Sequence, residues 1–381
     1  MKNSISKIII LFMLVAFSIV FCGCWDYTEM DDVKYVAGFA VDKDKDEYIL
    51  TLEIMEASIG SNAIKSDIVQ SRGKTIHSAL RDAIENTGKV LQLSHAKVVI
   101  VSEEIAEEGI VPAIDLINRD VEVRNDMWIL ISGMDTASEI LTKGKIEDEI
   151  ISYELAETIK NSNKIGKYNS VESFKFISDL SNKGIDATAP MVKTVKQESK
   201  VYFQVFGTAV FKQDKMIGKL NEEEAVTLQI LREKNPIFII PIELHNKDNV
   251  SLEIMNTNRK LKVKTENNKI YISTYINIDV AISELAEEEV NYISKENREK
   301  LKKQVEEYID KNANELIQKL QKEYKSDIVG FGDLIRKDVP KEWRKIGNKW
   351  KDKYQDTDIK VYANVNIKYS GLNKQNIKVR E

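Results

Sequence analysis

The chain has 381 residues, of which 43% are hydrophobic and 31% charged, with only 5 Pro and 16 Gly. This is the composition of an ordinary globular protein, and it excludes the disordered and fibrous classes. The length predicts two or three domains rather than one. A formal charge of −5 gives no general attraction to phosphate backbones, so nucleic acid is not an expected partner.

The first two dozen residues have the layout of an export signal. Lys2 and Lys7 precede an uncharged apolar run over 8–21, and Gly23 and Cys24 follow. This order is typical of a secretory signal peptide, and the run is shorter than the roughly 20 residues of a bilayer-spanning helix. A cysteine just after the small residues predicts a lipoprotein in which Cys24 becomes the first residue and carries a diacylglyceryl group. Two acyl chains anchor a protein stably to a membrane.

Three alternatives are open for this segment: a plain cleaved signal peptide that leaves Cys24 a free thiol, an uncleaved anchor helix, or a buried core helix. In the preferred interpretation, residues 1–23 are removed, the charge falls from −5 to −7 as two lysines leave, and the body lies outside the cytoplasm at a membrane face. Because Cys22 and Cys24 are the only cysteines, that body contains no disulfide, no Cys nucleophile and no thiolate metal site.

Alternating and helical patterns predict an α/β first domain over 24–190. Strands that alternate with helices favour some parallel pairing. The hairpin turn carries Asp42, Asp44 and Asp46 at calcium-loop spacing, but Glu47 stands where that loop needs glycine, so a solvated turn is preferred. The elements expected in order are a hairpin over 33–55, a loop over 58–71, a helix over 75–87 capped by Gly88, a strand over 90–101, a helix over 103–118 with Gly109 and Pro112 as potential break points, a buried strand over 127–131, and helices near 136–142, 147–161 and 171–182.

Two further α+β domains are predicted, over 191–265 and 266–381. The middle domain begins with a hairpin over 201–220, and Asn221 with Glu224 is a helix-start signature. Short strands are expected over 237–244, 251–255 and 261–265. The last domain combines an alternating strand over 270–282, a long amphipathic helix from Ser294 to about Tyr324, short helices over 331–350 and a final strand over 361–369.

Motifs that carry chemistry are not found. Residues 73–75 lack the first glycine of a phosphate-binding loop, and the Gly330-Phe331-Gly332 segment lacks the third glycine of a dinucleotide fingerprint and follows a helix. The three histidines are far apart and have no metal-ligand spacing. We therefore expect no catalytic residue, no cofactor and no metal site, and favour a binding or interaction protein over an enzyme.

Several segments, in order and spacing, resemble one family. They are Gly23-Cys24-Trp25-Asp26, Arg119-Asp120-x-Glu122-x-Arg124, the hairpin segment 207–211 with 218–220, and Asp327-Ile328-x-Gly330-Phe331-Gly332 followed by Pro340, Trp343 and Trp350. Together they resemble the Ger(x)C family, the lipoprotein C subunits of bacterial spore nutrient germinant receptors. The similarity spans residues 20–372, and Phe21 is a minor departure within the lipidation motif.

The resemblance implies an α+β fold: an elongated multidomain body of about three α+β domains with mixed β-sheets flanked by helices. It also implies assembly with the integral membrane A and B receptor subunits at the spore inner membrane and a response to small nutrients, with no catalytic residue to transfer. A lipoprotein that itself binds the nutrient in a cleft between domains is the alternative, and an exported hydrolase is a third.

Two motif clusters have either a structural or an interface interpretation. Arg119, Asp120 and Arg124 can pair locally and fix the turn over 118–125, or present an interface. Trp343 and Trp350 share a helical stripe with Ile346, which is most often core. Which residues contact a ligand is not predicted.

Overall fold

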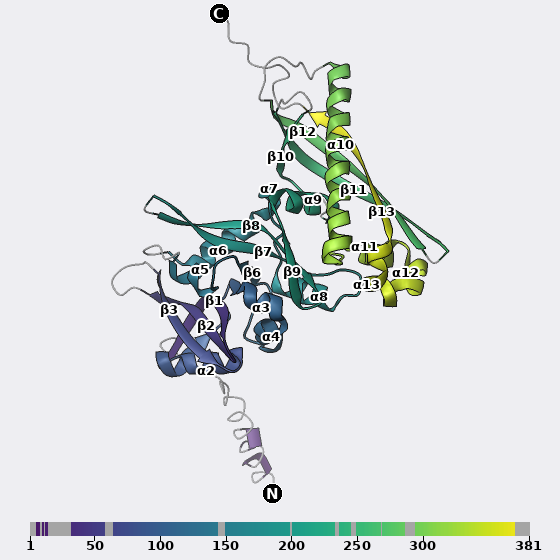
Figure 1. Ribbon diagram of the computed structural model, residues 1–381. Helices are drawn as coiled ribbons and strands as arrows, with labels where there is room; N and C mark the ends of the chain where they lie inside the picture. The colour runs from purple at the N-terminus through teal and green to yellow at the C-terminus, as the bar shows by residue number, and fades with distance from the viewer. Residues whose placement is uncertain are drawn as a thin grey trace, which may run out of the picture.

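The computed structural model describes residues 5–7, 10, 12–13, 32–57, 64–143, 149–198, 200–232, 236–244, 249–267, 269–285 and 294–369. Its strands form two sheets, one of nine strands and one of four. Figure 1 shows these sheets in two lobes, one beyond the other. The α+β class is confirmed, with mixed sheets flanked by helices.

The nine-stranded sheet of the first lobe runs in the order β3-β2-β1-β5-β6-β7-β8-β9, and β4 pairs with β1. The central strands β1, β5, β6 and β7 pair in parallel, as the alternation of strands and helices predicts, while β2–β3 and β8–β9 extend the sheet in antiparallel fashion. The strands are β1 (Val33–Asp44), β2 (Glu47–Ala57), β3 (Ile64–Gly73), β4 (Val90–Gln92), β5 (Val98–Val101), β6 (Trp128–Ser132), β7 (Thr188–Gln197), β8 (Lys200–Lys212) and β9 (Lys215–Leu220).

Helices cover both faces of this sheet, and a separate apolar core lies on each. A fully buried strand such as β5, all four residues of which are inaccessible to solvent, is typical of parallel sheets covered in this way. The helices are α2 (Ile76–Thr87), α3 (Glu103–Glu108), α4 (Val111–Arg119), α5 (Ser138–Lys143), α6 (Ile151–Lys160), α7 (Ser162–Ile165) and α8 (Ser173–Ser181).

Two buried carboxylates fix helices to the sheet. Asp42 of β1 accepts hydrogen bonds from the backbone N–H groups of Ala137 and Ser138 at the start of α5, at 2.6 and 2.9 Å. Glu53 of β2 accepts from Ile151 and Ser152 at the start of α6, at 2.8 and 2.7 Å. Each carboxylate therefore satisfies amides that a helix start leaves unpaired. The prediction of a solvated turn is therefore wrong for Asp42, which is only 4% exposed.

The second lobe is a four-stranded sheet, ordered β10-β11-β12-β13, with the long helix α10 packed along it (Figure 1). The chain passes from β12 through α10 to β13, which pairs with β12 in parallel. Helix α9 (Glu222–Arg232) connects the lobes. The elements are β10 (Ile239–Glu243), β11 (Asn249–Glu266), β12 (Lys269–Leu285), α10 (Lys295–Lys319), a π-helical turn η2 (Leu320–Tyr324), α11 (Phe331–Asp338), α12 (Pro340–Ile346), 3-10 turns η3 (Gly347–Lys349) and η4 (Tyr354–Asp356), α13 (Trp350–Lys353) and β13 (Asp358–Tyr369).

Three local expectations are wrong. Residues 64–71, expected as part of a loop over 58–71, belong to the edge strand β3, because their backbone pairs with β2 although only one side chain of the strand is buried. The strand expected over 90–101 is interrupted between β4 and β5. Two short strands expected over 251–265 are one strand, β11, since a bulge near Met255 absorbs the irregularity without ending the pairing.

The domain boundaries at residues 190 and 265 stay predictions. The sheets divide the described chain elsewhere, because strands of 33–220 share the first sheet and strands of 239–369 share the second. Residues 191–220 lie with the first lobe, and their inner side chains Val210 and Leu220 also pack into the core of the second.

Candidate functional site

Cys24, the predicted lipidation site, lies outside the described residues, as does His245. Within the described chain, no helix is long and apolar enough to span a bilayer. The same residues contain no cluster of side chains suited to holding a metal ion. The remaining predicted residues fall into two places, one on each lobe.

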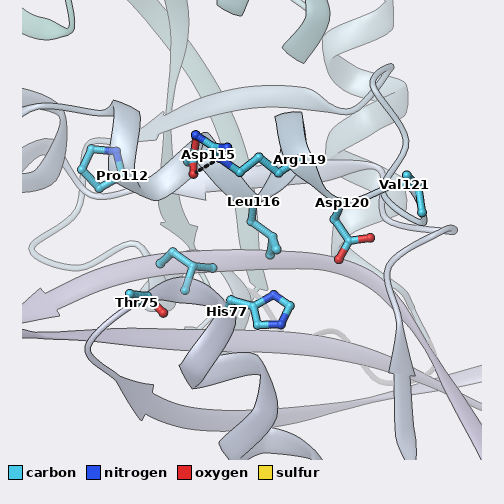
Figure 2. Close-up of a pocket in the computed structure, with 9 residues that line it drawn as sticks. Thr75, His77, Pro112, Asp115, Leu116, Arg119, Asp120 and Val121 are labelled. Carbon is cyan, nitrogen blue, oxygen red and sulfur yellow. Dashed lines mark hydrogen bonds and ion pairs between the residues drawn. The ribbon is translucent and has the colours of Figure 1, made fainter.

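The first place is a hollow of about 450 Å³ between α2 and α4, shown in Figure 2. Arg119 lies on its rim and donates from Nε to Asp115 Oδ2 at 2.6 Å, one turn earlier on α4. Asp120 ends the helix, where its Oδ1 accepts the N–H of Glu122 at 2.9 Å. The hollow is lined by Thr75, Ile76, His77, Pro112, Asp115, Leu116, Arg119, Asp120 and Val121.

Arg124 lies further along the same turn and pairs with Asp126. This hydrogen bond raises the pKa of Arg124 and lowers the pKa of Asp126. Each arginine pairs within its own turn, with an aspartate outside the set of Arg119, Asp120, Glu122 and Arg124. Whether these residues have a structural or an interface role stays a prediction. Exposed pairs of this kind contribute little to stability.

The second place is a buried carboxylate at the junction of the lobes. Asp327 Oδ1 accepts the N–H groups of Gly330 and Phe331 at 2.9 and 3.0 Å. Asp327 Oδ2 accepts the N–H of Gly332 and the indole Nε1 of Trp350, each at 2.9 Å. Four donors thus converge on one carboxylate, which explains the spacing of the Asp-x-x-Gly-x-Gly segment and the presence of a tryptophan 23 residues later.

Burial is the largest influence on this group and raises the pKa of Asp327 to about 6, although N–H donors at Gly332, Phe331 and Trp350 lower it and Asp186 raises it further. Asp186, from the first lobe, accepts from Ser326 Oγ at 3.1 Å and from the N–H of Asp327 at 2.9 Å. Its own N–H donates to the carbonyl of Asp327 at 3.0 Å. Lys351 lies 3.3 Å from the other oxygen of Asp186.

Two glycines bring the lobes into backbone contact beside this carboxylate. A Cβ atom on Gly332 would lie 2.7 Å from the Cα of Gly184 and 2.5 Å from Trp350 Nε1, and a Cβ on Gly184 would lie 2.6 Å from the N of Asp333. The carbonyl of Gly184 accepts the N–H of Asp333 at 2.9 Å. Only glycine permits this approach.

Trp350 is 1% exposed. Trp343 is half-buried and packs on it, with ring centroids 6.3 Å apart. Trp343 also borders a small hollow of about 360 Å³ with Ser178, Ser181 and Asn182 of the first lobe. Both tryptophans therefore lie at the junction, one inside it and one at its margin.

A second buried link is the pair Asp179 and Arg232. Arg232 Nη2 lies 2.9 Å from Asp179 Oδ2, and Nη1 donates to Thr188 Oγ1 at 3.1 Å and to the Ile328 carbonyl at 3.4 Å. Gln229, one helical turn earlier, donates to the carbonyls of Gly166 and Tyr168. Neither Asp186 nor the Asp179–Arg232 pair was singled out from the sequence, because their partners are dozens of residues distant.

The described chain is thus a two-lobed α+β protein that holds its lobes together with buried polar contacts. Two family models match it: one described as "Spore germination protein N-terminal domain" over residues 26–194, and one described as "Spore germination B3/ GerAC like, C-terminal" over residues 206–371. The chain belongs to the Ger(x)C family of spore germination proteins.

Full-length relatives are similarly distant. "Putative spore germination protein YfkR" of Bacillus subtilis (strain 168) is 25% identical, with 98% of each chain covered. "Spore germination protein KC" of the same organism is 24% identical, again with 98% of each chain covered. "Spore germination protein GerQC" of Bacillus cereus is 26% identical over 95% of this chain and 98% of that one.

A solved structure, "Crystal Structure of the GerBC protein", superposes with a TM-score of 0.57 at 20% identity and covers 87% of this chain and 96% of that chain. At this identity the match shows the shared fold.

Proposed function

We propose that this chain is a lipid-anchored, non-enzymatic subunit of a spore germinant receptor, required for the response to small nutrients through assembly with the integral membrane A and B subunits. The observation that carries the proposal is the match of two consecutive germination family models, to residues 26–194 and 206–371. Relatives whose printed names call them spore germination proteins match over nearly their whole length.

The anchor in this proposal is Cys24, at the outer face of the cell membrane, which becomes the spore inner membrane. It is supported by the export signal that precedes it in the sequence. The non-enzymatic role is supported by the positions of the buried carboxylates. Asp42, Glu53 and Asp327 cap helices or join the lobes, and they do not line the hollow between α2 and α4.

The test is deletion of this chain, followed by restoration of the wild-type chain or of Cys24→Ala. Loss of the response to one nutrient, with responses to non-nutrient triggers intact, is expected on deletion. Restoration by wild type but not by Cys24→Ala, together with loss of the Cys24→Ala chain from the membrane fraction, supports the anchor. A normal response of the deletion strain to every nutrient, in a background without paralogous receptors, contradicts the proposal.

A second candidate function is capture of the nutrient by this chain itself. The hollow between α2 and α4 favours it, since it combines the apolar side chains of Ile76 and Leu116 with charges of both signs at Arg119 and Asp120. Calorimetric titration of the purified chain with amino acids, sugars and nucleosides separates the two candidates. Heat of binding that disappears in Arg119→Ala supports capture, and no heat supports assembly alone.

A further inference from the structure

One face of the second sheet is covered and the other is open. Helix α10 and the apolar side chains of β12 and β13 form the core on the covered side. On the opposite side, alternate residues of β11, β12 and β13 lie in register, so that Lys260 is opposite Tyr275 and Tyr275 is opposite Tyr362. We name the residues Lys260, Lys262, Lys264, Tyr275, Lys360 and Tyr362 the lysine–tyrosine face.

This face has an excess of positive charge in a chain of net charge −5. Among the described residues, no acid lies within ion-pair range of Lys260, Lys262 or Lys360. Lys264 pairs with Glu266 at 2.5 Å. Two other acids lie on this side of the sheet: Asp358, two residues before Lys360 on β13, and Asp279 of β12, which pairs with Lys368. Within the part of the chain that the structure describes, Lys260, Lys262 and Lys360 therefore form no ion pair, and lysines outnumber acids on this surface.

The two tyrosine rings of this face contact each other and a neighbouring lysine. Tyr275 and Tyr362 stack with centroids 5.4 Å apart and planes 20° from parallel, while Lys262 Nζ lies 5.1 Å from the centroid of the Tyr275 ring. One face of the Tyr275 ring therefore packs against Tyr362 of β13, and the other contacts Lys262 of β11. Both faces of the Tyr275 ring are therefore occupied. The polar groups that this surface offers are phenol hydroxyls and ammonium groups, which donate hydrogen bonds.

An array of donors and positive charges on an open surface fits anionic oxygens. Tyrosine and lysine side chains also suit the headgroup depth of a bilayer, where an apolar stem and a polar tip are both satisfied. Each lysine near an anionic membrane surface strengthens binding about fivefold, which is too little for stable binding alone. It is enough when a lipid tether already holds the protein at that surface, since one anchor supplements the other.

We propose that the lysine–tyrosine face binds the phosphate headgroups of an anionic bilayer, so that the molecule lies along the membrane to which Cys24 tethers it. The inference rests on the proposed function for the tether, but the contact itself is a separate property of β11, β12 and β13.

The test is flotation of the full chain with vesicles of phosphatidylcholine alone or with added phosphatidylglycerol. The contribution of the lysine–tyrosine face is the difference in binding between the two lipid mixtures, because an acyl anchor contributes little to that difference. Binding of wild type is expected to increase about 10- to 100-fold with phosphatidylglycerol and to lose that increment in high salt. The increment is expected to vanish in the triple variant Lys260→Gln, Lys262→Gln, Lys360→Gln.

The matched control is Lys295→Gln, Lys303→Gln, Lys311→Gln, which removes the same charge from the exposed side of α10 and is expected to retain the increment. Equal binding of wild type to both lipid mixtures, or an undiminished increment in the first triple variant, overturns the inference. Loss of copurifying membrane subunits from that variant without loss of vesicle binding also overturns it and assigns the face to an acidic protein. Absence of a lipid on Cys24 with the increment intact contradicts the proposed anchor and leaves the face standing.

Discussion

At the scale of single residues, Asp327 explains more of the family motif than any other side chain. It satisfies three backbone N–H groups and one indole at once, and buried donors of this kind are costly when left unpaired. The glycines, the aspartate and the tryptophan of the motif are therefore one hydrogen-bonded unit.

Replacement of Asp327 by Asn tests this unit. Whichever way the amide is turned, its NH₂ group faces two N–H donors, so we expect the free energy of unfolding to fall by about 2–4 kcal/mol. Urea unfolding followed by tryptophan fluorescence measures the change. Asp338→Asn, at the exposed end of α11, is the matched control and should stay within about 0.5 kcal/mol of wild type. Equal stability of the two variants would show that the convergence of donors is incidental.

Asp327 should also make the free energy of unfolding depend on pH. The folded-state pKa of Asp327 is about 6, above its ordinary value of 3.8, so the folded state binds this proton more tightly than the unfolded state does. The stability from this group is fully present below pH 4 and is lost as pH rises through about 6. Wild type should therefore lose stability relative to Asp327→Asn as pH rises from 4 to 8. A difference that is constant over this range would falsify the assignment.

At the scale of elements, α10 protects the edge of the second sheet. Glu306, Asp310 and Asn314, spaced one turn apart, accept the outward N–H groups of Val365, Ala363 and Val361 at 2.9, 2.5 and 3.2 Å. Without this cover, β13 would present a long row of unpaired amides, which is a template for aggregation. The acids on this side of α10 therefore have a role that amphipathic spacing alone does not reveal.

Substitution of Asp310 by Ala should uncover part of this edge. We expect faster hydrogen exchange at the Ala363 amide and a loss of about 1 kcal/mol in stability, because one hydrogen bond to a charged group disappears. Exchange measured by mass spectrometry on peptides from 358–369 detects it. Lys311→Ala, the next residue and exposed, leaves the bond in place; unchanged exchange in Asp310→Ala relative to this control would refute a protective role.

What the sequence could predict depends on whether a pattern is local. The stripe of α10, the Asn221–Glu224 box and the Gly88 cap are set by neighbours within a few residues, and all are present in the structure. Strand β3 was missed because an edge strand with only one buried side chain has no apolar alternation to detect. The partnership of Asp327 with Asp186 joins positions 141 residues apart, and no periodicity signals a contact of that kind.

At the scale of the whole molecule, the junction joins two lobes that otherwise have separate sheets. The apolar core of the second lobe continues through α9 to the inner side of β8 and β9. Around it, Asp186, Arg232 and the paired glycines supply contacts that hold only in one relative position of the lobes. A subunit that passes a change from one protein surface to another needs such a coupling, since loosely tethered lobes transmit little.

Substitution of Gly184 by Ala tests the coupling. The added methyl would meet the backbone of Asp333 and Gly332 at 2.6 and 2.7 Å, and backbone has little room to move, so the lobes must separate. We expect a loss of about 1–3 kcal/mol and, in scanning calorimetry, a single unfolding transition of wild type that broadens or splits in the variant.

Gly88→Ala provides the comparison that isolates this effect. Gly88 ends α2 at φ +66°, and no atom lies within 4 Å of an added Cβ, so alanine there strains the backbone by about 1 kcal/mol without touching the junction. Its transition should shift to lower temperature and remain as sharp as that of wild type. If Gly184→Ala behaves in the same way, the lobes do not depend on the glycine contact for their cooperation, and the coupling must lie in the apolar core alone.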